Sequence, residues 1–298
     1  MATGSAMLES HSALVEKRLF LVECIGHPSE GPGLSLTWEG WESDMRRVHH
    51  YGTRKVMRYR PSLYVHSGRV WYLVFEWILP WIRERFPDLY GELRIPLIRA
   101  IVWHHDDPEL QPLGDIPLQY KLMMTKSELK GLKQKEVEAI EAMVRCYRHR
   151  NGKPRLVEGY PYRDVLFHAH RKDCMEAQLV SAADKLEAFS SGLHEALAGN
   201  GVFIEPVFNY CMHTFNSFPK KYPLIRKLFT CRKSLFSFPP CNLAGIFKDG
   251  SLPGGPHTRE TITWDTKIPP YEIWKQLTVK HFGEELLLKE VESFLLQA

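Results

Sequence analysis

The chain has few cysteines, and no two of them lie at the spacing of a metal-binding or redox pair. Its 298 residues contain six cysteines at widely scattered positions, without a C-x-x-C motif. A disulfide framework needs densely placed cysteines in a short chain, and a cysteine zinc site needs closely spaced pairs. The pattern argues against both, and reduced, buried thiols are the simpler interpretation.

The chain also lacks a large charge of one sign and a long apolar run. It has 39 Lys and Arg against 35 Asp and Glu, an excess too small to predict nucleic-acid binding from charge alone. The most apolar segment, VWYLVFEWILPWI, contains Glu76 and is too short to cross a bilayer. The N-terminus shows no basic start followed by an apolar run, so no secretory signal is predicted. We therefore expect a cytoplasmic protein without a membrane-spanning segment.

Apolar residues recur at helical spacing along much of the chain, with no alternation long enough for a large sheet. The hydrophobic content of 44% suffices for a substantial core. We expect a mostly α-helical bundle. Helices are predicted at about 67–86 with an interruption at Pro80, and at about 93–104, 127–150, 174–197 and 270–296. Short strands are predicted, at most, at 18–38 and 258–266.

The domain organisation follows from changes in composition along the chain. Residues 1–39 read as an N-terminal lead-in, because their opening is polar and lacks helical periodicity. Residues 40–197 contain the periodic helical segments and are predicted to form the core domain. Beyond Gly199 the sequence becomes rich in Pro, Phe and Lys, and residues 198–298 are predicted to pack on the core as a C-terminal extension.

Four residues that are distant in sequence make a candidate metal site: His66 before one predicted helix, His105 and Asp106 at the end of the next, and Asp184 within a later one. Two imidazoles and two carboxylates suit a first-row divalent ion and leave positions for water and a phosphate oxygen. Taken singly, a histidine such as His66 is more often structural or at the surface. The combination predicts one bound divalent ion, and the sequence does not choose among Mn, Co, Fe, Ni, Zn and Mg.

The order of these motifs resembles the HD-domain superfamily of metal-dependent phosphohydrolases. His66 is followed by HHDDPE at 104–109, GDIP at 114–117 and AADKLEAF at 182–189. This order is most similar to that of the bacterial 5′-deoxynucleotidase branch. The resemblance covers roughly residues 40–197 and leaves the last hundred residues without a counterpart.

The resemblance implies a role for each matching residue. His66, His105, Asp106 and Asp184 would bind one divalent metal ion, Glu109 would match the catalytic acid, and Asp115 would match the second active-site carboxylate. The implied activity is release of phosphate from a nucleoside 5′-monophosphate, and the resemblance favours a deoxynucleoside monophosphate as the substrate. His104 creates an ambiguity of register, but only His105 directly precedes Asp106, so His104 is expected to pack or to support the ligands.

Phosphate must also be held, and a basic run precedes the first predicted ligand. Arg54, Arg58 and Arg60 are candidates, because a planar guanidinium can contact phosphate through two bonds. A solvated basic face is an equally good interpretation.

Other residues are candidates for further roles. His149, His168 and His170 are candidates for a second metal, although unmatched histidines more often lie at the surface. Trp71, Trp103 and Tyr120 are candidates for stacking on a base, although such residues are more often part of a core.

Two other functions remain open from the sequence. The same metal site supports removal of triphosphate or pyrophosphate from a nucleotide. Alternatively, the chain is a catalytically idle HD-like module that binds a nucleotide or nucleic acid. In each case the expected partner is a small phosphorylated molecule, most simply a nucleotide, and a homodimer is compatible with the apolar C-terminal region.

Overall fold

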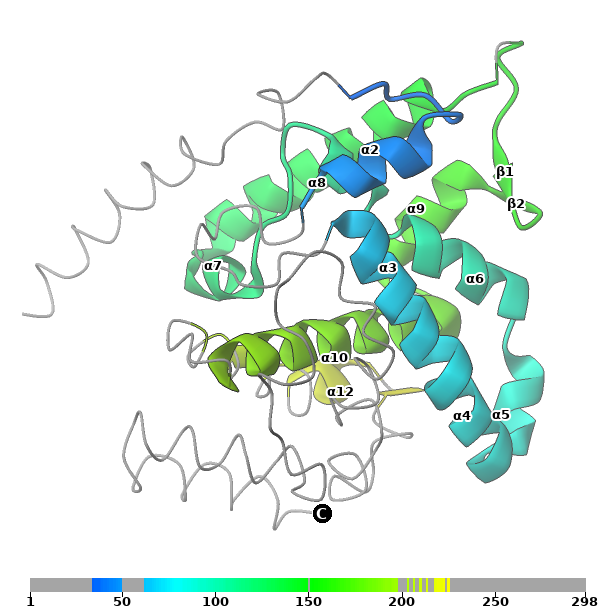
Figure 1. Cartoon of the computed structure of the whole chain (residues 1–298), viewed down its shortest axis with the longest axis vertical. Helices are drawn as coiled ribbons and strands as arrows, with labels where there is room; N and C mark the ends of the chain where they lie inside the picture. The colour runs from blue at the N-terminus through cyan, green and yellow to red at the C-terminus, as the bar shows by residue number, and fades with distance from the viewer. Residues whose placement is uncertain are drawn as a thin grey trace, which may run out of the picture.

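The computed structural model describes residues 34–49, 62–149 and 151–197, together with individual positions between 203 and 225. The described chain is mostly helical, as predicted (Figure 1). The predicted helix at 270–296, the predicted strand at 258–266 and most of that at 18–38 lie outside the described residues. The helices of the described part lack the length and apolar composition that a bilayer crossing requires. The main elements are α2 Trp41–Arg47, α3 Leu63–Tyr72, η2 Leu73–Ile78, α4 Leu79–Arg85, α5 Pro87–Glu92, α6 Ile95–His104, η3 Asp107–Leu110, α7 Leu118–Met123, α8 Lys126–Cys146, α9 Tyr162–Arg171, α10 Met175–Leu197 and α12 Phe218–Lys221.

The first predicted helix is built from three consecutive helical segments, α3, η2 and α4. Ser62 caps α3, because its hydroxyl accepts a hydrogen bond from the backbone N–H of Val65 at 3.3 Å. The π-helical segment η2 ends just before Pro80, which lies in the first turn of α4. Proline cannot donate the next helical hydrogen bond and its ring crowds the preceding turn, so the predicted interruption takes the form of a wider π turn.

Helix α8 starts with a full capping box, which the sequence analysis did not identify. The hydroxyl of Thr125 accepts a hydrogen bond from the backbone N–H of Glu128, and the carboxylate of Glu128 accepts one from the backbone N–H of Thr125. The prediction had placed the helix start at Ser127 without such a box. The motif S/T-x-x-E begins two residues earlier, as Thr125 to Glu128, and it satisfies two backbone N–H groups at the helix start.

The segment between α8 and α10 was predicted to be a connection, but it contains a helix and a hairpin. The strands β1 (Leu156–Val157) and β2 (Tyr160–Pro161) pair antiparallel across a two-residue turn. Both turn residues, Glu158 and Gly159, have positive φ angles of 51° and 85°, as tight hairpin turns require. No strand forms within the described part of the predicted strand at 18–38, residues 34–38.

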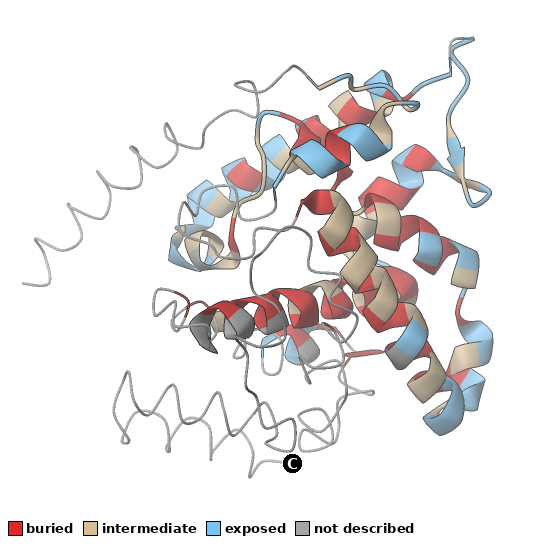
Figure 2. Cartoon of the chain, viewed as in Figure 1, coloured by how far each residue is buried: buried red, intermediate tan, exposed pale blue. Residues whose placement is uncertain are grey.

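Helix α10 lies at the centre of the larger of two hydrophobic clusters. It packs against α3, η2, α6 and α9, and its predicted apolar stripe is buried at Leu179, Ala182, Ala183, Leu186 and Phe189. The larger cluster also includes buried residues from the C-terminal region: Phe203, Phe218, Tyr222, Leu224 and Ile225. Figure 2 shows the contrast between the largely buried α10 and the more exposed α8.

A second cluster joins α2 to α8 and α9, and it includes part of the predicted lead-in. Leu34, Leu36 and Trp38 pack against it, and the backbone N–H of Leu36 donates to the buried carboxylate of Asp44 at 2.8 Å. The last residues of the segment predicted as a lead-in therefore contact the core.

The start of α6 is fixed to α10 by an ion pair. Arg94 donates its backbone N–H and two guanidinium N–H groups to the carboxylate of Glu176, at 2.9–3.0 Å. The Glu176 side chain is 2% exposed. Burial alone would raise the pKa of Glu176, but the hydrogen bonds from Arg94 lower it to about 2. The pair holds in place the helix that ends at the predicted metal ligands.

We expect Glu176→Gln to lower the free energy of unfolding by about 1–3 kcal/mol near neutral pH, because it weakens a buried, charge-assisted set of hydrogen bonds. The folded-state pKa of Glu176, about 2, lies below its ordinary value of 4.5, so the contribution is present above pH 4.5 and is lost as the pH falls through 2. Urea unfolding at several pH values measures this, with the gap between the two proteins closing toward low pH.

The exposed pair Glu42–Arg46 on α2 supplies the matched control. Glu42→Gln is expected to leave the free energy of unfolding close to the wild-type value at every pH, because exposed ion pairs contribute little. A gap between wild type and Glu176→Gln that stays constant down to about pH 2 contradicts the assigned pKa.

Candidate metal centre

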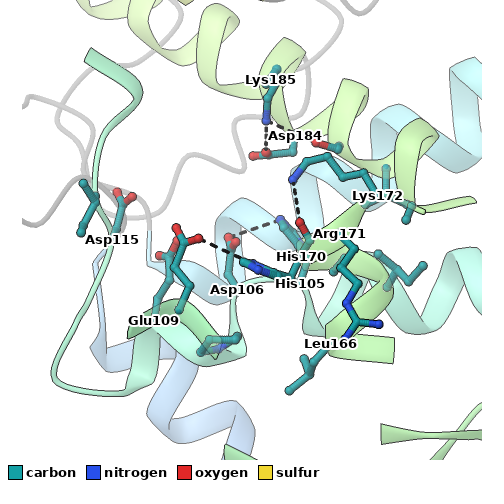
Figure 3. A pocket seen from close by; sticks show the side chains of 18 of the residues that line it. His105, Asp106, Glu109, Asp115, Leu166, His170, Arg171, Lys172, Asp184 and Lys185 are labelled. Atoms are coloured by element: carbon teal, nitrogen blue, oxygen red, sulfur yellow. Dashed lines mark hydrogen bonds and ion pairs between the residues drawn. The ribbon is translucent and has the colours of Figure 1, made fainter. Parts of the chain in front are cut away.

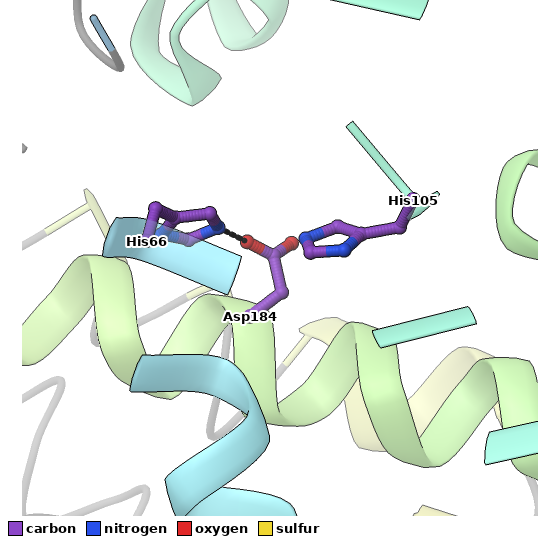
Figure 4. A group of neighbouring side chains, drawn as sticks. All are labelled: His66, His105 and Asp184. Atoms are coloured by element: carbon purple, nitrogen blue, oxygen red, sulfur yellow. Dashed lines mark ion pairs between the residues drawn. The ribbon is translucent and has the colours of Figure 1, made fainter. Parts of the chain in front are cut away.

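Three of the four predicted ligands converge from three different helices. His66 lies in the first turn of α3, His105 directly follows α6, and Asp184 lies in the middle of α10. One donor atom from each lies within 4.8 Å of the others, and Figure 4 shows the carboxylate of Asp184 between the two imidazole rings. The packing of α3 and α6 on α10 therefore assembles a group that can hold a metal ion.

The fourth predicted ligand, Asp106, lies beside this group without completing it. Its Oδ2 atom is 3.3 Å from Nε2 of His66 and 3.3 Å from Nε2 of His105. Asp106 is not one of the three residues whose donor atoms all lie within 4.8 Å of one another. The structure thus brings all four residues together and gives the tightest convergence to His66, His105 and Asp184.

Hydrogen bonds on the outer side of each imidazole orient it toward the group. Nδ1 of His66 lies 2.8 Å from Oε2 of Glu187, and Nδ1 of His105 lies 2.9 Å from the carbonyl oxygen of Val102. A carbonyl only accepts, as does an ionised carboxylate, so each Nδ1 carries the proton and donates it. Each Nε2 atom then presents a lone pair toward Asp106 and Asp184. This is the arrangement by which carboxylates and carbonyls orient metal-ligating histidines.

Sequence reasoning missed Glu187, the residue that orients His66. Its carboxylate is buried and also accepts hydrogen bonds from Arg69 at 3.1 Å and from Ser191 at 2.7 Å. Glu187 lies three residues after Asp184 on α10, so both project from the same face of the helix. An acidic residue at that spacing within AADKLEAF was the available signal.

The electrostatics of the group favour a bound cation. Burial lowers the pKa of His66, but the charges and hydrogen bonds of Glu187, Asp184 and Asp106 raise it well above its usual value. Burial raises the pKa of Asp184, whereas Lys185, His66 and His105 bring it well below its usual value. The carboxylates around His66 therefore favour a positive charge between the side chains of the group. Either a proton on an imidazole or a bound metal ion can carry that charge.

A divalent ion fits the residues present. Nε2 of His105 and Oδ2 of Asp106 are buried and make no hydrogen bond within the part of the chain that the structure describes. Buried polar atoms of this kind call for a partner. Two imidazole nitrogens together with carboxylate oxygens suit first-row divalent ions. The donor set thus agrees with the predicted cofactor, and it does not distinguish among the candidate metals.

The group opens onto a cavity of about 510 Å³ between α8 and α10. His105, Asp106 and Asp184 line it, and so do the two predicted catalytic carboxylates, Glu109 and Asp115 (Figure 3). Glu109 lies in η3 and is held close to Asp106 by the short turn between them. Burial, together with the charges of Asp106 and Asp115, raises the pKa of Glu109 well above its usual value. The predicted metal ligands and acids therefore share one cavity.

Basic side chains also line the same cavity, which sequence reasoning did not predict. The predicted phosphate ligands Arg54, Arg58 and Arg60 lie outside the described residues. Six other basic side chains line the cavity: Lys121, Lys133, Arg171, Lys172, Lys185 and Lys221. They come from segments far apart in sequence, so no local motif announces them.

His104 does not join the metal group, in agreement with the assignment of His105 as the ligand. Its Nδ1 atom lies 2.8 Å from Oδ2 of Asp107, and its ring stacks on Trp38. Asp107 is fully buried and also accepts hydrogen bonds from Nε1 of Trp41 at 2.7 Å and from the hydroxyl of Tyr162 at 2.6 Å. Residues 104 and 107 thus fix the chain on one side, while 105 and 106 face the cavity.

The remaining candidates lie elsewhere. Trp71 stacks on Phe75, and Trp103 lines a separate cavity of about 310 Å³ with Trp38, Trp41 and Tyr64. Trp71, Trp103 and Tyr120 are not among the described residues that line the cavity at the metal group.

The histidines suggested for a second metal are dispersed. His170 lies 3.6 Å from Glu136, whereas His168 forms a separate group with Asp173 and Cys174, whose donor atoms all lie within 4.8 Å of one another. His149, His168 and His170 therefore do not form a common group in the described part of the chain.

No protein-family model, curated protein or solved structure matches this chain. The resemblance of its motifs to the HD-domain superfamily therefore remains a prediction from the residues. The geometry of the described side chains is an independent ground for a functional assignment.

We expect the wild-type chain to gain thermal stability on addition of Mn²⁺ or another divalent ion, and His105→Ala and Asp184→Ala to lose that gain. A ligand at about 100 times its dissociation constant stabilises the folded state by about 2.7 kcal/mol. Thermal unfolding with and without metal, together with the metal content of the purified protein, measures the effect.

His149→Ala is the matched control, because His149 is exposed and lies outside the group. It is expected to retain the full metal-dependent shift. A shift of equal size in the His105 and Asp184 variants contradicts the assignment of these side chains as ligands.

Proposed function

We propose that the chain is a metal-dependent phosphohydrolase that releases phosphate from a nucleoside 5′-monophosphate, with a deoxynucleotide as the expected substrate. The observation that carries the proposal is the joint placement of the metal group and Glu109 in one cavity that basic side chains also line. The motif order supports the same reaction class. A cavity of about 510 Å³ is within the usual size range of small-molecule sites.

His66, His105 and Asp184, with Asp106 beside them, would hold the divalent ion. Such an ion lowers the pKa of a water molecule and offsets negative charge on a phosphoryl oxygen. The chain's own contribution is to fix the two Nε2 atoms through Glu187 and Val102. A rigid donor set of this kind keeps its geometry as charge develops during the reaction.

Glu109 is the best-placed proton carrier of the described side chains. Its side chain is half-buried, with a buried Oε2 atom. Burial and the charges of Asp106 and Asp115 favour its protonated form, and it lines the cavity at the metal group. From there it can protonate the leaving alkoxide, or, once ionised, orient and deprotonate the attacking water. Asp115, on the loop before α7, is the second carboxylate available for the other half of this exchange.

Two further functions are compatible with the same site. Release of pyrophosphate or triphosphate uses the same ligands and a longer anionic substrate. An idle nucleotide-binding module keeps the ligands without turnover, but the presence of both Glu109 and Asp115 at the cavity argues against it. A phosphate-release screen over nucleoside mono-, di- and triphosphates with several divalent metals separates the three.

We expect Glu109→Gln to lower kcat by about 10²–10⁴, because the amide cannot transfer the proton, while metal content stays at the wild-type level. Glu84→Gln is the control, since Glu84 is exposed and distant from the cavity. Steady-state phosphate release and metal analysis measure the two properties separately. Wild-type turnover in Glu109→Gln excludes Glu109 as the proton carrier, and absence of turnover in every wild-type assay favours the idle module.

A further inference from the structure

We propose that Lys172, with Lys121 and Lys185, forms an anion subsite that binds a phosphate group of the substrate beside the metal group. The proposal rests on the proposed function in one respect, that the substrate is phosphorylated. It assigns a phosphate contact to lysines of α7, the α9–α10 connection and α10; the upstream arginines that the sequence suggested lie outside the described residues.

Lys172 combines an unusual backbone conformation with a side chain that lines the cavity. It ends α9 with φ 56° and ψ 39°, in the left-handed region. A lysine there has a steric cost that glycine avoids. Its side chain nevertheless lines the cavity, and Nζ donates a long bond of 3.4 Å to the carbonyl of His170. Figure 3 shows the amine near His170 and turned toward the side of Asp184.

Lys172 lacks a carboxylate partner, whereas its two basic neighbours have one. Lys121 donates to Glu136 at 3.0 Å, and Lys185 donates to Asp184 at 3.2 Å. No ion pair of Lys172 occurs with any residue that the structure describes. Lys172 is half-buried, and an ammonium withdrawn from water near two others is unfavourable unless an anion joins them.

The charge balance of the cavity also favours an added anion. Six Lys and Arg side chains line it against five carboxylates, namely Asp106, Glu109, Asp115, Glu136 and Asp184. A divalent ion at the metal group would make the excess larger. Phosphate oxygens can accept from several ammonium groups at once, and the three lysines approach from three different segments.

The titration of Lys172 agrees with this placement. Burial, then the charges of Lys185 and Lys121, lower the pKa of Lys172 to about 7, against the opposing charges of Asp184 and Glu136. His170 also faces this region, and burial together with Lys185 and Lys172 lowers the pKa of His213 to about 4. A bound dianion offsets the repulsion and favours the protonated amine. Anion binding is therefore expected to weaken as the pH rises through 7.

The test measures inorganic phosphate binding to the Mn²⁺-loaded full chain by calorimetry. Lys172→Met removes the charge and keeps the length, and Lys172→Gly also removes the backbone strain. Both are expected to raise the dissociation constant of phosphate by about tenfold or more, with Mn²⁺ binding unchanged. Lys172→Arg is expected to retain most of the affinity. Lys130→Met, an exposed position of α8 outside the cavity, is expected to bind as the wild type does.

The outcomes for the subsite and for the hydrolase separate. Phosphate affinity equal to wild type in both Lys172→Met and Lys172→Gly overturns the subsite, whether or not the chain hydrolyses nucleotides. Weakened phosphate binding in these variants, in a wild type without turnover, supports the subsite and overturns the hydrolase.

Sulfate gives a second measurement, because it stays a dianion between about pH 6 and 9 and the pH dependence of its binding reports the protein. Weaker sulfate binding by the wild type above pH 7, with a flatter profile in Lys172→Met, supports Lys172 as the ligand. A wild-type profile as flat as that of the variant counts against it.

Discussion

The candidate site depends on the fixed orientation of two imidazole rings. Glu187 and the carbonyl of Val102 take the Nδ1 protons of His66 and His105, and this leaves both Nε2 atoms directed at Asp106 and Asp184. A freely rotating histidine would need to be ordered when a ligand binds, at a cost in side-chain entropy. Here the packing of α3, α6 and α10 has already met that cost during folding.

The cavity is lined by both the metal group and several lysines. His105, Asp106 and Asp184 line it, and so do lysines of α7, α8, α10 and the α9–α10 connection. An anionic group bound there would lie between the divalent ion that the metal group would hold and the lysine side chains. This distribution of charge favours the orientation of a phosphorylated molecule in which the phosphate, and not the uncharged part, contacts these cations.

The sequence predicted the residues whose meaning depends on chain order, and it missed those that depend on packing. Helical periodicity located α6 and α10, and the ordered motifs singled out the four candidate ligands. Helix α9 was not predicted, because its ten residues mix aromatic and basic side chains and show no clear apolar stripe in the sequence. In the structure Tyr162, Val165 and Leu166 are nevertheless buried on one side of it. Lys121, Lys172 and Lys185 become neighbours only through the fold, so no local pattern identifies them.

Residues 104–107 connect the metal group to aromatic side chains of the core. His104 and Asp107 are held by Trp38, Trp41 and Tyr162, and the two residues between them, His105 and Asp106, face the cavity. A single peptide bond therefore separates an aromatic interior from the candidate donor atoms. Substitutions that change the volume of that interior would displace His105 and Asp106 without contacting them, so packing behind the candidate site constrains its geometry as much as the cavity does.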